Sequence, residues 1–546
     1  MTKSRNRTIR KSEDRSWSRR EVISTAARVA SALAVPQLWL PKAWGATTTF
    51  DYYISTSGND ANPGTLASPW ALTSFQDTSP NNRLMAGKRV GLIAGNYSTA
   101  GITTTHTADA DYTYSLLNIP AGTSGSSTYI ASCDTSGNYS ARAAIITVGG
   151  TPTLGIMGSG GGQMGGGTSS HITVDGIVIN GNNLDWNLGA LQMTGHLLQF
   201  WGTYDGTNTS NPASETGIVV TNCEIYGIRT TSHPGNNGAL VWFEGCYNCI
   251  VQNNYLHDAT STFAADQDHV HAIEEYGCHG NQYIYNTITN SSSGIEAKLA
   301  CTGTICAYNY FYNVGVGMAG ASSVFEGFDG ASGNSNSGPS PINYYLHHNV
   351  IDGCGTLHMA DLNTTFLAQP INVYNNTVYD TSGGATAGWQ LFAEGANLVS
   401  FYNNIYFTTQ GTGGGGGHNG KLNVAANGNA KLDYNYWYQA AGNYTAMWGI
   451  NTTTYNSFAA WQAAIGSSYE THSRTGNPAF SGSITSGKGA AQFQLASGSP
   501  CIGTGSGGVN IGAWDGTVTQ IGCSFALGST TSGSPPVPAA PVLSVK

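Results

Sequence analysis

Four copies of one short pattern, an apolar residue followed by glutamate, lie between Ala239 and Gly330, in the order Phe243-Glu244, Ile273-Glu274, Ile295-Glu296 and Phe325-Glu326. Successive copies are separated by 30, 22 and 30 residues. A repeat of this length indicates stacked supersecondary units that form a solenoid. If each unit is one coil, the four glutamates lie close together on parallel strands about 4.8 Å apart.

A second recurring position supports the same repeat. Asparagine or aspartate returns along the chain, in most cases with an apolar or aromatic residue two positions later. Stacked asparagine amides can hydrogen-bond from one coil to the next. We expect this ladder to be lost beyond about residue 420, where Trp437, Trp448 and Trp461 cover the open end of the core. The predicted ladder consists of Asp175, Asn222, Asn254, Asn286, Asn309, Asn349, Asn376 and Asn404.

The composition agrees with a stacked all-β protein. Only 9% of the 546 residues are charged, and the chain contains 73 glycines, which is typical of closely packed strands and tight turns. Residues 1–45 hold ten of the 21 Lys and Arg but three of the 30 Asp and Glu, so the remainder carries a net charge of −16. Such an acidic body argues against nucleic acid or an anionic membrane as a partner.

The first 45 residues have the three parts of an export signal. A basic segment leads to Ser18-Arg19-Arg20-Glu21-Val22-Ile23, an apolar run follows, and Ala43-Trp44-Gly45 ends it as a small-x-small cleavage site. The first of these stretches resembles the twin-arginine motif. The apolar run is short and contains Arg28 and Pro36, so it does not predict a membrane span. The twin-arginine export machinery is therefore an expected partner, and the expected location is periplasmic or extracellular.

Several stretches of the mature chain share one resemblance. Asp51–Trp70, Ala86–Tyr97 and the C-terminal pieces Asn477–Phe480, Leu495–Pro500 and Asn510–Ala513 are similar to segments of secreted proteins of the pectin-lyase-like superfamily. The resemblance implies a right-handed single-stranded parallel β-helix with terminal caps. The expected organisation is a signal peptide over 1–45, an N-terminal cap and first coils over 46–130, a β-helix core over 131–420, C-terminal coils and a cap over 421–527, and a flexible tail over 528–546.

Ten cysteines occur in a chain that we expect to be exported, where disulfides can form. Cys246, Cys278 and Cys301 each precede a ladder asparagine by eight residues. This regularity favours an inward-facing stack of free thiols. Cys501 and Cys523 are the best candidates for a disulfide.

Ionisable residues gather around the glutamate column. Neighbouring carboxylates repel one another, so a cation, a basic side chain or protonation must stabilise them. We predict Glu244, Glu274, Glu296 and Glu326 as ligands of Ca²⁺, a hard cation that prefers oxygen. The candidate catalytic residues are Lys298, His279 and His271, and the candidate substrate-binding residues are Glu275, Asp329, His358 and Asp361.

These residue types suggest β-elimination of a polysaccharide that contains uronic acid. A cation neutralises the uronate carboxylate, and a base then removes the adjacent proton. The alginate lyase and chondroitinase B family is a partial resemblance, with His279 at its lysine position and Lys298 at its arginine position. Two alternatives remain: a glycoside hydrolase that pairs Glu274 or Glu296 with Asp329 or Glu326, and a non-catalytic carbohydrate-binding or surface β-helix protein.

Overall fold

A computed structural model describes residues 49–525, apart from gaps at 77–82, 104–114, 151, 153, 161–168, 186–194, 203–214, 232–237, 263–269, 299–300, 316–322, 329–343, 360–370, 381–388, 392–398, 410–421, 425–430, 443, 445 and 451–452. The predicted signal peptide and C-terminal tail lie outside these residues. Within the described ranges, no helix combines the length and the apolar character that crossing a bilayer requires.

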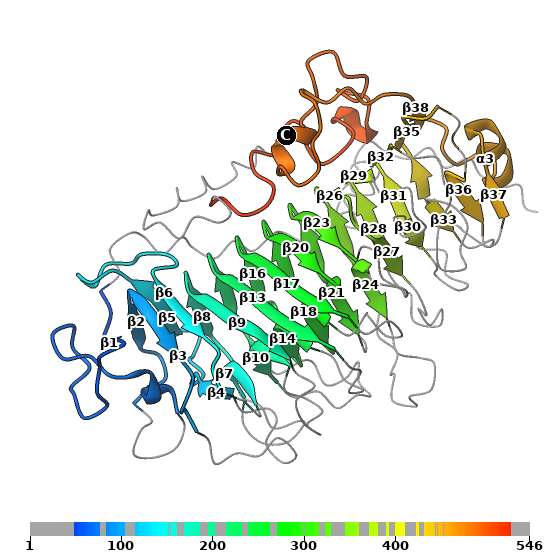
Figure 1. Ribbon diagram of the computed structural model, residues 1–546. Coiled ribbons are helices and arrows are strands. Elements are labelled where there is room, and N and C mark those ends of the chain that lie inside the picture. Colours follow the sequence, from blue (N-terminus) through cyan, green and yellow to red (C-terminus); the bar gives the residue numbers. More distant parts are fainter. Residues whose placement is uncertain are drawn as a thin grey trace, which may run out of the picture. The chain divides into compact units, whose positions relative to one another are not determined.

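The described chain winds into a right-handed parallel β-helix, as predicted, and three twelve-stranded sheets form its walls (Figure 1). Sheet A comprises β1 (Tyr52–Ile54), β2 (Arg89–Ile93), β5 (Thr128–Cys133), β8 (Ile172–Asp175), β12 (Val219–Thr221), β16 (Ile250–Gln252), β19 (Gln282–Ile284), β22 (Ile305–Ala307), β25 (Tyr345–His347), β28 (Ile371–Tyr374), β31 (Val399–Tyr402) and β34 (Lys431–Asp433).

Sheet B carries the candidate site described below. It comprises β4 (Ser115–Asn118), β7 (Gly155–Ser159), β10 (His196–Trp201), β14 (Gly238–Glu244), β18 (Val270–Tyr276), β21 (Ser293–Lys298), β24 (Ser323–Phe328), β27 (Thr356–Met359), β30 (Trp389–Leu391), β33 (Leu422–Val424), β36 (Trp448–Ile450) and β37 (Thr453–Tyr455). Its strands are parallel except for β37, which pairs with β36 in the antiparallel direction.

Sheet C completes each coil. It comprises β3 (Gly95–Ser98), β6 (Ala144–Thr147), β9 (Val178–Asp185), β13 (Glu224–Thr230), β17 (Tyr255–Ser261), β20 (Thr287–Ser291), β23 (Tyr310–Val314), β26 (Val350–Asp352), β29 (Thr377–Asp380), β32 (Ile405–Thr408), β35 (Tyr436–Gln439) and β38 (Arg474–Thr475). The remaining elements are the pair β11 (Glu215–Thr216) and β15 (Cys246–Tyr247), the helix α3 (Phe458–Ile465), and the 3₁₀ turns η1 (Leu72–Phe75), η2 (Ala490–Phe493) and η3 (Ser506–Gly508).

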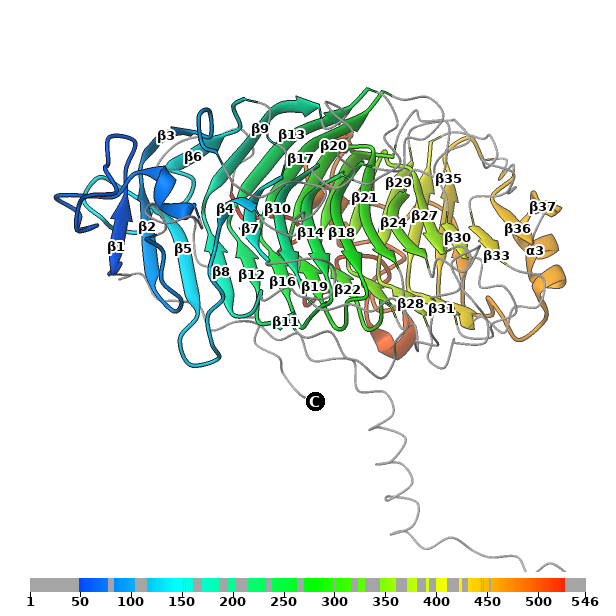
Figure 2. The same ribbon diagram turned by 90° about the horizontal axis from the view of Figure 1, so that it is seen from below.

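Each coil gives one strand to sheet A, one to sheet C and one to sheet B in that order, so equivalent residues of successive coils stack (Figure 2). Side chains of alternating strand positions fill the interior with a continuous apolar core. Cys246, Cys278 and Cys301 belong to this core, and the backbone N–H groups of Cys246 and Cys278 each donate to the thiol of the next coil. The predicted stack of inward-facing thiols is confirmed.

The asparagine ladder joins sheets A and C at a sharp turn. At Asn309, for example, Oδ1 accepts from the backbone N–H of Asn286 at 2.8 Å, while Nδ2 donates to the backbone carbonyl of Tyr283 at 2.8 Å and to Oδ1 of Asn349 at 3.0 Å. Each ladder amide therefore satisfies buried backbone groups and links consecutive coils. The pattern repeats at Asn254, Asn286, Asn349, Asn376 and Asn404.

Two limits of the predicted ladder are wrong. Cys223 and not Asn222 takes the ladder position before Asn254, because the backbone N–H of Cys223 donates to Asn254 Oδ1. Asn222 instead donates a hydrogen bond to Asp175. The Asp175 carboxylate also accepts hydrogen bonds from the hydroxyl groups of two tyrosines outside the ladder. At the other end the ladder continues past residue 420 to Asn435, whose backbone N–H donates to Ser473 Oγ.

The C-terminal end of the core is closed by aromatic residues, as expected. Trp437, Trp448 and Trp461 are fully buried, and the rings of Trp448 and Trp461 stack with centroids 6.5 Å apart. Trp461 projects from α3, which begins at the N-cap Ser457, whose side chain accepts from the backbone N–H of Ala460.

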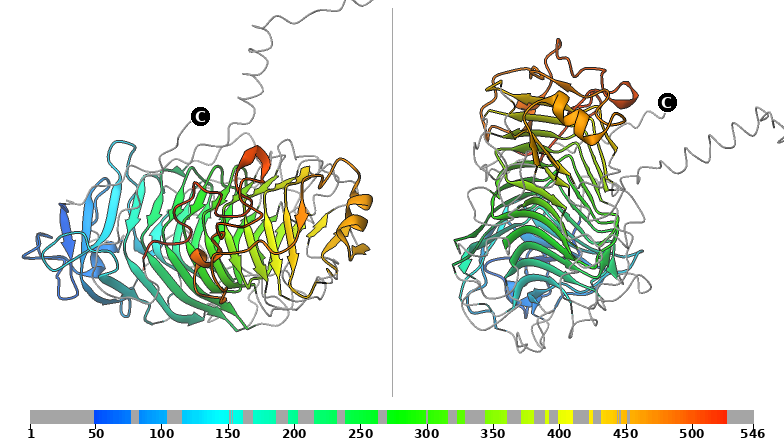
Figure 3. Two further views of the ribbon diagram at one scale, coloured as in Figure 1. Left: turned by 90° about the horizontal axis from the view of Figure 1, so that it is seen from above. Right: turned by 90° about the vertical axis from the view of Figure 1, so that its right-hand side faces the viewer.

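The chain does not stop at this cap but turns back along the outside of the coils. We call residues 477–525 the return segment. It contacts Asn403 through Ser506, Asn375 through Gly512, His348 through Asp515, Tyr308 through Gly522, Thr287 through Cys523 and Asn253 through Ser524. Its last described residue, Phe525, lies under the guanidinium of Arg142 at 3.6 Å. The segment therefore crosses coils in reverse order, as the orange and red trace in Figures 1 and 3 shows.

The predicted disulfide between Cys501 and Cys523 is wrong. Both cysteines are free thiols. Cys501 packs beside Ile405 and Tyr436, whereas Cys523 binds Thr287 several coils away. The two residues belong to distant parts of the return segment.

Glu470 in the C-terminal cap makes stability depend on pH. Burial raises the pKa of its carboxyl to about 7 from the usual 4.5, although hydrogen bonds from Ser473 and Asn435 oppose the shift. A raised pKa means that the neutral form stabilises the fold below pH 4.5, and that this contribution is lost as pH rises through about 7. Between pH 4.5 and pH 8 the unchanged protein should lose about 3 kcal/mol of its free energy of unfolding through Glu470. We expect this loss to be absent in Glu470→Gln, as measured by urea unfolding at both pH values. An unchanged pH dependence in this variant would contradict the assignment.

Candidate functional site

The candidate site lies on the outer face of sheet B, where two rows of side chains cross the strands. In the first row, Trp242 of β14 pairs with Glu274 of β18, which is followed by Glu296 of β21 and Glu326 of β24. In the second row, two positions further along each strand, Glu244 pairs with Tyr276, which pairs with Lys298. The strands alternate inward and outward positions, so both rows point away from the core.

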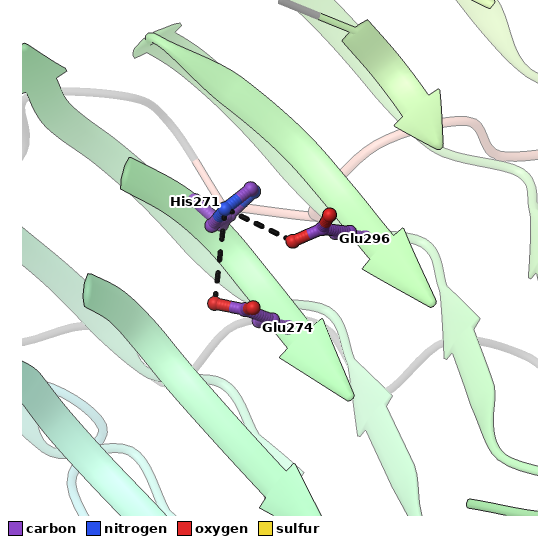
Figure 4. A group of neighbouring side chains, drawn as sticks. All are labelled: His271, Glu274 and Glu296. Atoms are coloured by element: carbon purple, nitrogen blue, oxygen red, sulfur yellow. Dashed lines mark ion pairs between the residues drawn. The ribbon is translucent and has the colours of Figure 1, made fainter. Parts of the chain in front are cut away.

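Four side chains meet at β18 and β21, and Figure 4 shows three of them: His271, Glu274 and Glu296. His271 Nε2 lies 3.1 Å from Glu296 Oε2 and 3.7 Å from Glu274 Oε2. Lys298 Nζ lies 2.6 Å from the other oxygen of Glu296, Oε1. The side chains of His271 and Glu274 are fully buried, that of Glu296 is 4% exposed and that of Lys298 is 16% exposed. Lys298 is therefore the member of this group through which solvent reaches the site.

Burial and mutual repulsion change the protonation of the acidic residues. Burial raises the pKa of Glu296, the Lys298 ammonium opposes this shift, and the Glu274 carboxylate adds to it, so the net shift is strongly upward. Burial by itself would lower the pKa of Lys298. The Glu296 and Glu274 carboxylates raise this pKa by more than burial lowers it, so the side chain remains an ammonium ion. The site therefore holds a positive charge on Lys298 beside the Glu296 carboxyl group, whose pKa is raised.

Glu244 does not belong to the row that the sequence predicted. The register places Trp242 beside Glu274, and Glu244 falls two positions further on, opposite Tyr276. Glu244 is 3% exposed, and burial together with the charge of Glu274 raises its pKa to about 8. The predicted column of four glutamates is thus a column of three, Glu274, Glu296 and Glu326, with Glu244 in the adjacent row.

Glu275, predicted to bind substrate, lies inside the coil. Its carboxylate accepts hydrogen bonds from Asn281 Nδ2 at 2.9 Å, Tyr283 OH at 2.6 Å and Thr304 Oγ1 at 2.5 Å. It is fully buried among these core partners. A satisfied interior carboxylate has a structural role, so we do not include Glu275 in the candidate site.

The remaining predicted site residues fall in three places. His279 lies in the turn after β18, in bridges with Tyr247 and Thr302, and burial lowers its pKa. No ion pair or hydrogen bond described for the chain joins it to the group around Glu296. His358 of β27 is the strand partner of Glu326. Asp329 and Asp361 lie outside the described residues.

Aromatic side chains that the sequence analysis did not single out border the charged group. Trp242 and Tyr276 have ring centroids 4.8 Å apart, and Trp201 and His196 continue the cluster at 5.5 Å and 4.2 Å from Trp242. Trp201 and Trp242 are only 1% and 3% exposed. This apolar border removes water from the adjacent carboxyl groups, which is the environment that raises their pKa values. Trp242 and Tyr276 lie two positions from Glu244 and Glu274, and this spacing was the available sequence signal.

The sequence matches no known family model and no curated protein sequence. Among solved structures, the chain is similar to pectate lyase Pel9A, with 13% identity over 86% of this chain and 97% of that chain and a TM-score of 0.42. The A-module of the Azotobacter vinelandii mannuronan C-5 epimerase AlgE4 has 10% identity over 79% and 98% of the two chains, with a TM-score of 0.42. The GH136 lacto-N-biosidase from Eubacterium ramulus has 12% identity over 74% and 65%, with a TM-score of 0.33. None of these likenesses assigns an activity or a site residue to this chain.

Proposed function

We propose that this protein is a polysaccharide-active enzyme that cleaves an acidic glycan by β-elimination on the outer face of sheet B. The observation that carries the proposal is the Lys298 ammonium held 2.6 Å from Glu296, with His271 and Glu274 beside it on the same face. A positive charge, proton acceptors and an apolar border are the parts that this reaction needs in one place.

The reaction places distinct demands on these side chains. The uronate carboxylate must be neutralised, and the Lys298 ammonium is positioned to pair with it. The C5–H bond then breaks and its proton passes to the group formed by His271 and Glu296, as the C4–O bond to the leaving sugar breaks. Tyr276 makes a side-chain hydrogen bond with Glu274, and burial keeps its pKa far above the usual 10, so its hydroxyl is available to protonate the leaving oxygen.

The repeat of the surface suits a repeating ligand. Equivalent positions of β14, β18, β21 and β24 recur from strand to strand in one register, at the spacing of about 4.8 Å set by the sheet. A polymer that lies across the coils can therefore contact the aromatic border, the charged group and Glu326 in succession. A short sugar would use only part of this surface.

Calcium, predicted from the glutamate pattern, fits the observed donors poorly. Ca²⁺ takes six to eight oxygen ligands, often from bidentate carboxylates. Here an imidazole nitrogen lies between two carboxylates, and Lys298 occupies Oε1 of Glu296. We therefore assign no step of the reaction to calcium.

A glycoside hydrolase is the second candidate, because Glu274 and Glu296 form a carboxyl pair. Paired hydrolase carboxyl groups are separated by about 5–9.5 Å. One oxygen of Glu274 and one of Glu296 lie within 4.8 Å of each other, at the short end of that range. The reaction product distinguishes hydrolysis from elimination.

The test is incubation of the purified protein with a panel of uronic-acid polysaccharides. A lyase produces an unsaturated uronate, so ultraviolet absorbance should rise together with new reducing ends, whether or not calcium is added. The variant His279→Ala serves as a control outside the charged group and should retain the activity. New reducing ends without absorbance would support hydrolysis, and no product on any acidic glycan would support a binding protein.

A further inference from the structure

Three side chains of the candidate site can supply one metal ion with a mixed donor set. Ligand atoms of His271, Glu274 and Glu296 all lie within 4.8 Å of one another. His271 and Glu274 come from β18, and Glu296 comes from the paired position on β21. The two strands fix this arrangement through their hydrogen-bonded register, so the donors need not be gathered from loops.

One atom of this group has no hydrogen-bond donor. Glu296 Oε2 is buried, and within the described part of the chain it forms no hydrogen bond of normal distance and angle, although His271 Nε2 lies 3.1 Å away. A buried oxygen without a donor is costly. A cation between the imidazole and the carboxylates would satisfy it.

The donor types indicate which cation this is. Lys298 holds Oε1 of Glu296, so Glu296 offers a single oxygen through Oε2. One imidazole nitrogen with two monodentate carboxylates suits zinc, manganese and other borderline divalent ions, whereas calcium takes oxygen ligands in larger number. Ligands bound at about 2.0–2.2 Å lie roughly 3–3.6 Å apart, close to the 3.1 Å and 3.7 Å observed from His271 Nε2.

We propose that His271, Glu274 and Glu296 bind one divalent transition-metal ion of the zinc–manganese class and discriminate against calcium. The proposal concerns the site of the proposed function and rests on that function for any catalytic role of the ion. A bound ion would occupy His271 Nε2 and Glu296 Oε2, so these atoms accept the C5 proton only in the metal-free protein. Metal binding itself does not depend on it.

The probe for this site is Co²⁺, whose visible absorption reports nitrogen and oxygen ligation. The protein is first freed of metal with a chelator and then titrated. We expect one Co²⁺ per chain with a saturable absorption band, displacement by one equivalent of Zn²⁺, and no displacement by a 100-fold excess of Ca²⁺. In His271→Gln, the affinity should fall by at least about 100-fold.

The matched control is His279→Gln, which changes a half-buried histidine of the same coil and should leave the band unchanged. If His271→Gln does not fold, Glu296→Gln provides the second test with the same expected loss. Absence of a band, an unchanged band in both site variants, or displacement by Ca²⁺ would overturn the proposal. A Co²⁺ band without product on any glycan would reject only the proposed lyase, and product without any metal binding would reject only this inference.

Discussion

Replacing Lys298 by methionine should lower kcat/KM on the acidic glycan by on the order of 10²–10³, the loss that follows removal of one preorganised charge from an active site. Methionine retains much of the length of the side chain but cannot neutralise the uronate carboxylate. Lys298→Arg should retain part of the activity because it keeps the charge. The measurement is the initial rate of ultraviolet absorbance at several substrate concentrations.

Two comparisons distinguish this effect from damage to the fold. Lys488→Met changes an exposed lysine of the return segment and should leave kcat/KM unaltered. Lys298→Met leaves Glu296 without its ion-pair partner, so the double variant Lys298→Met/Glu296→Gln should recover thermal stability but not activity. Full activity in Lys298→Met at an unchanged melting temperature would exclude the role we assign to Lys298.

Asn309→Ala should lower the free energy of unfolding by about 3–5 kcal/mol, because each buried polar group left without a partner costs about 1–3 kcal/mol. The substitution removes the acceptor of the Asn286 N–H and the donor to the Tyr283 carbonyl. It also breaks the link to Asn349. Urea denaturation followed by circular dichroism gives the value.

The appropriate control changes the same residue type at an exposed strand position. Asn96 of β3 is exposed, and Asn96→Ala should shift the free energy of unfolding by less than about 0.5 kcal/mol. Equal effects of Asn96→Ala and Asn309→Ala would mean that the ladder contributes no special stability.

The sequence allowed the fold to be predicted because its signals are local and repeated. The ladder asparagines and the apolar-Glu steps recur once per coil, and stacking converts this recurrence into contact. The ends of the ladder were harder to predict from the sequence. Cys223 provides only a backbone N–H to Asn254, and its side chain carries no amide that would mark the position. The return segment was not predicted, because its contacts join residues far apart in sequence without any common spacing.

The candidate site was predicted in part for a related reason. Glu274, Glu296 and Glu326 follow the repeat and share a row, but Glu244 lies in the next row because its strand registers against Tyr276. Neighbouring residues of a strand point to opposite faces, so an error of one position moves a side chain from the outer face to the interior. Glu275 follows the outward Glu274 and points into the core, where the pattern predicts an apolar residue. Its carboxylate accepts hydrogen bonds there from Asn281, Tyr283 and Thr304.

The return segment changes how the solenoid resists unfolding. In a simple stack each coil touches only its neighbours, so the ends fray independently and coils can be lost one by one. Here Asp515, Gly522 and Ser524 hold coils at His348, Tyr308 and Asn253, which precede them by 167, 214 and 271 positions. Residues 515–524 thus fasten the middle of the chain, and a truncation that removes them takes support from coils that these residues do not themselves form.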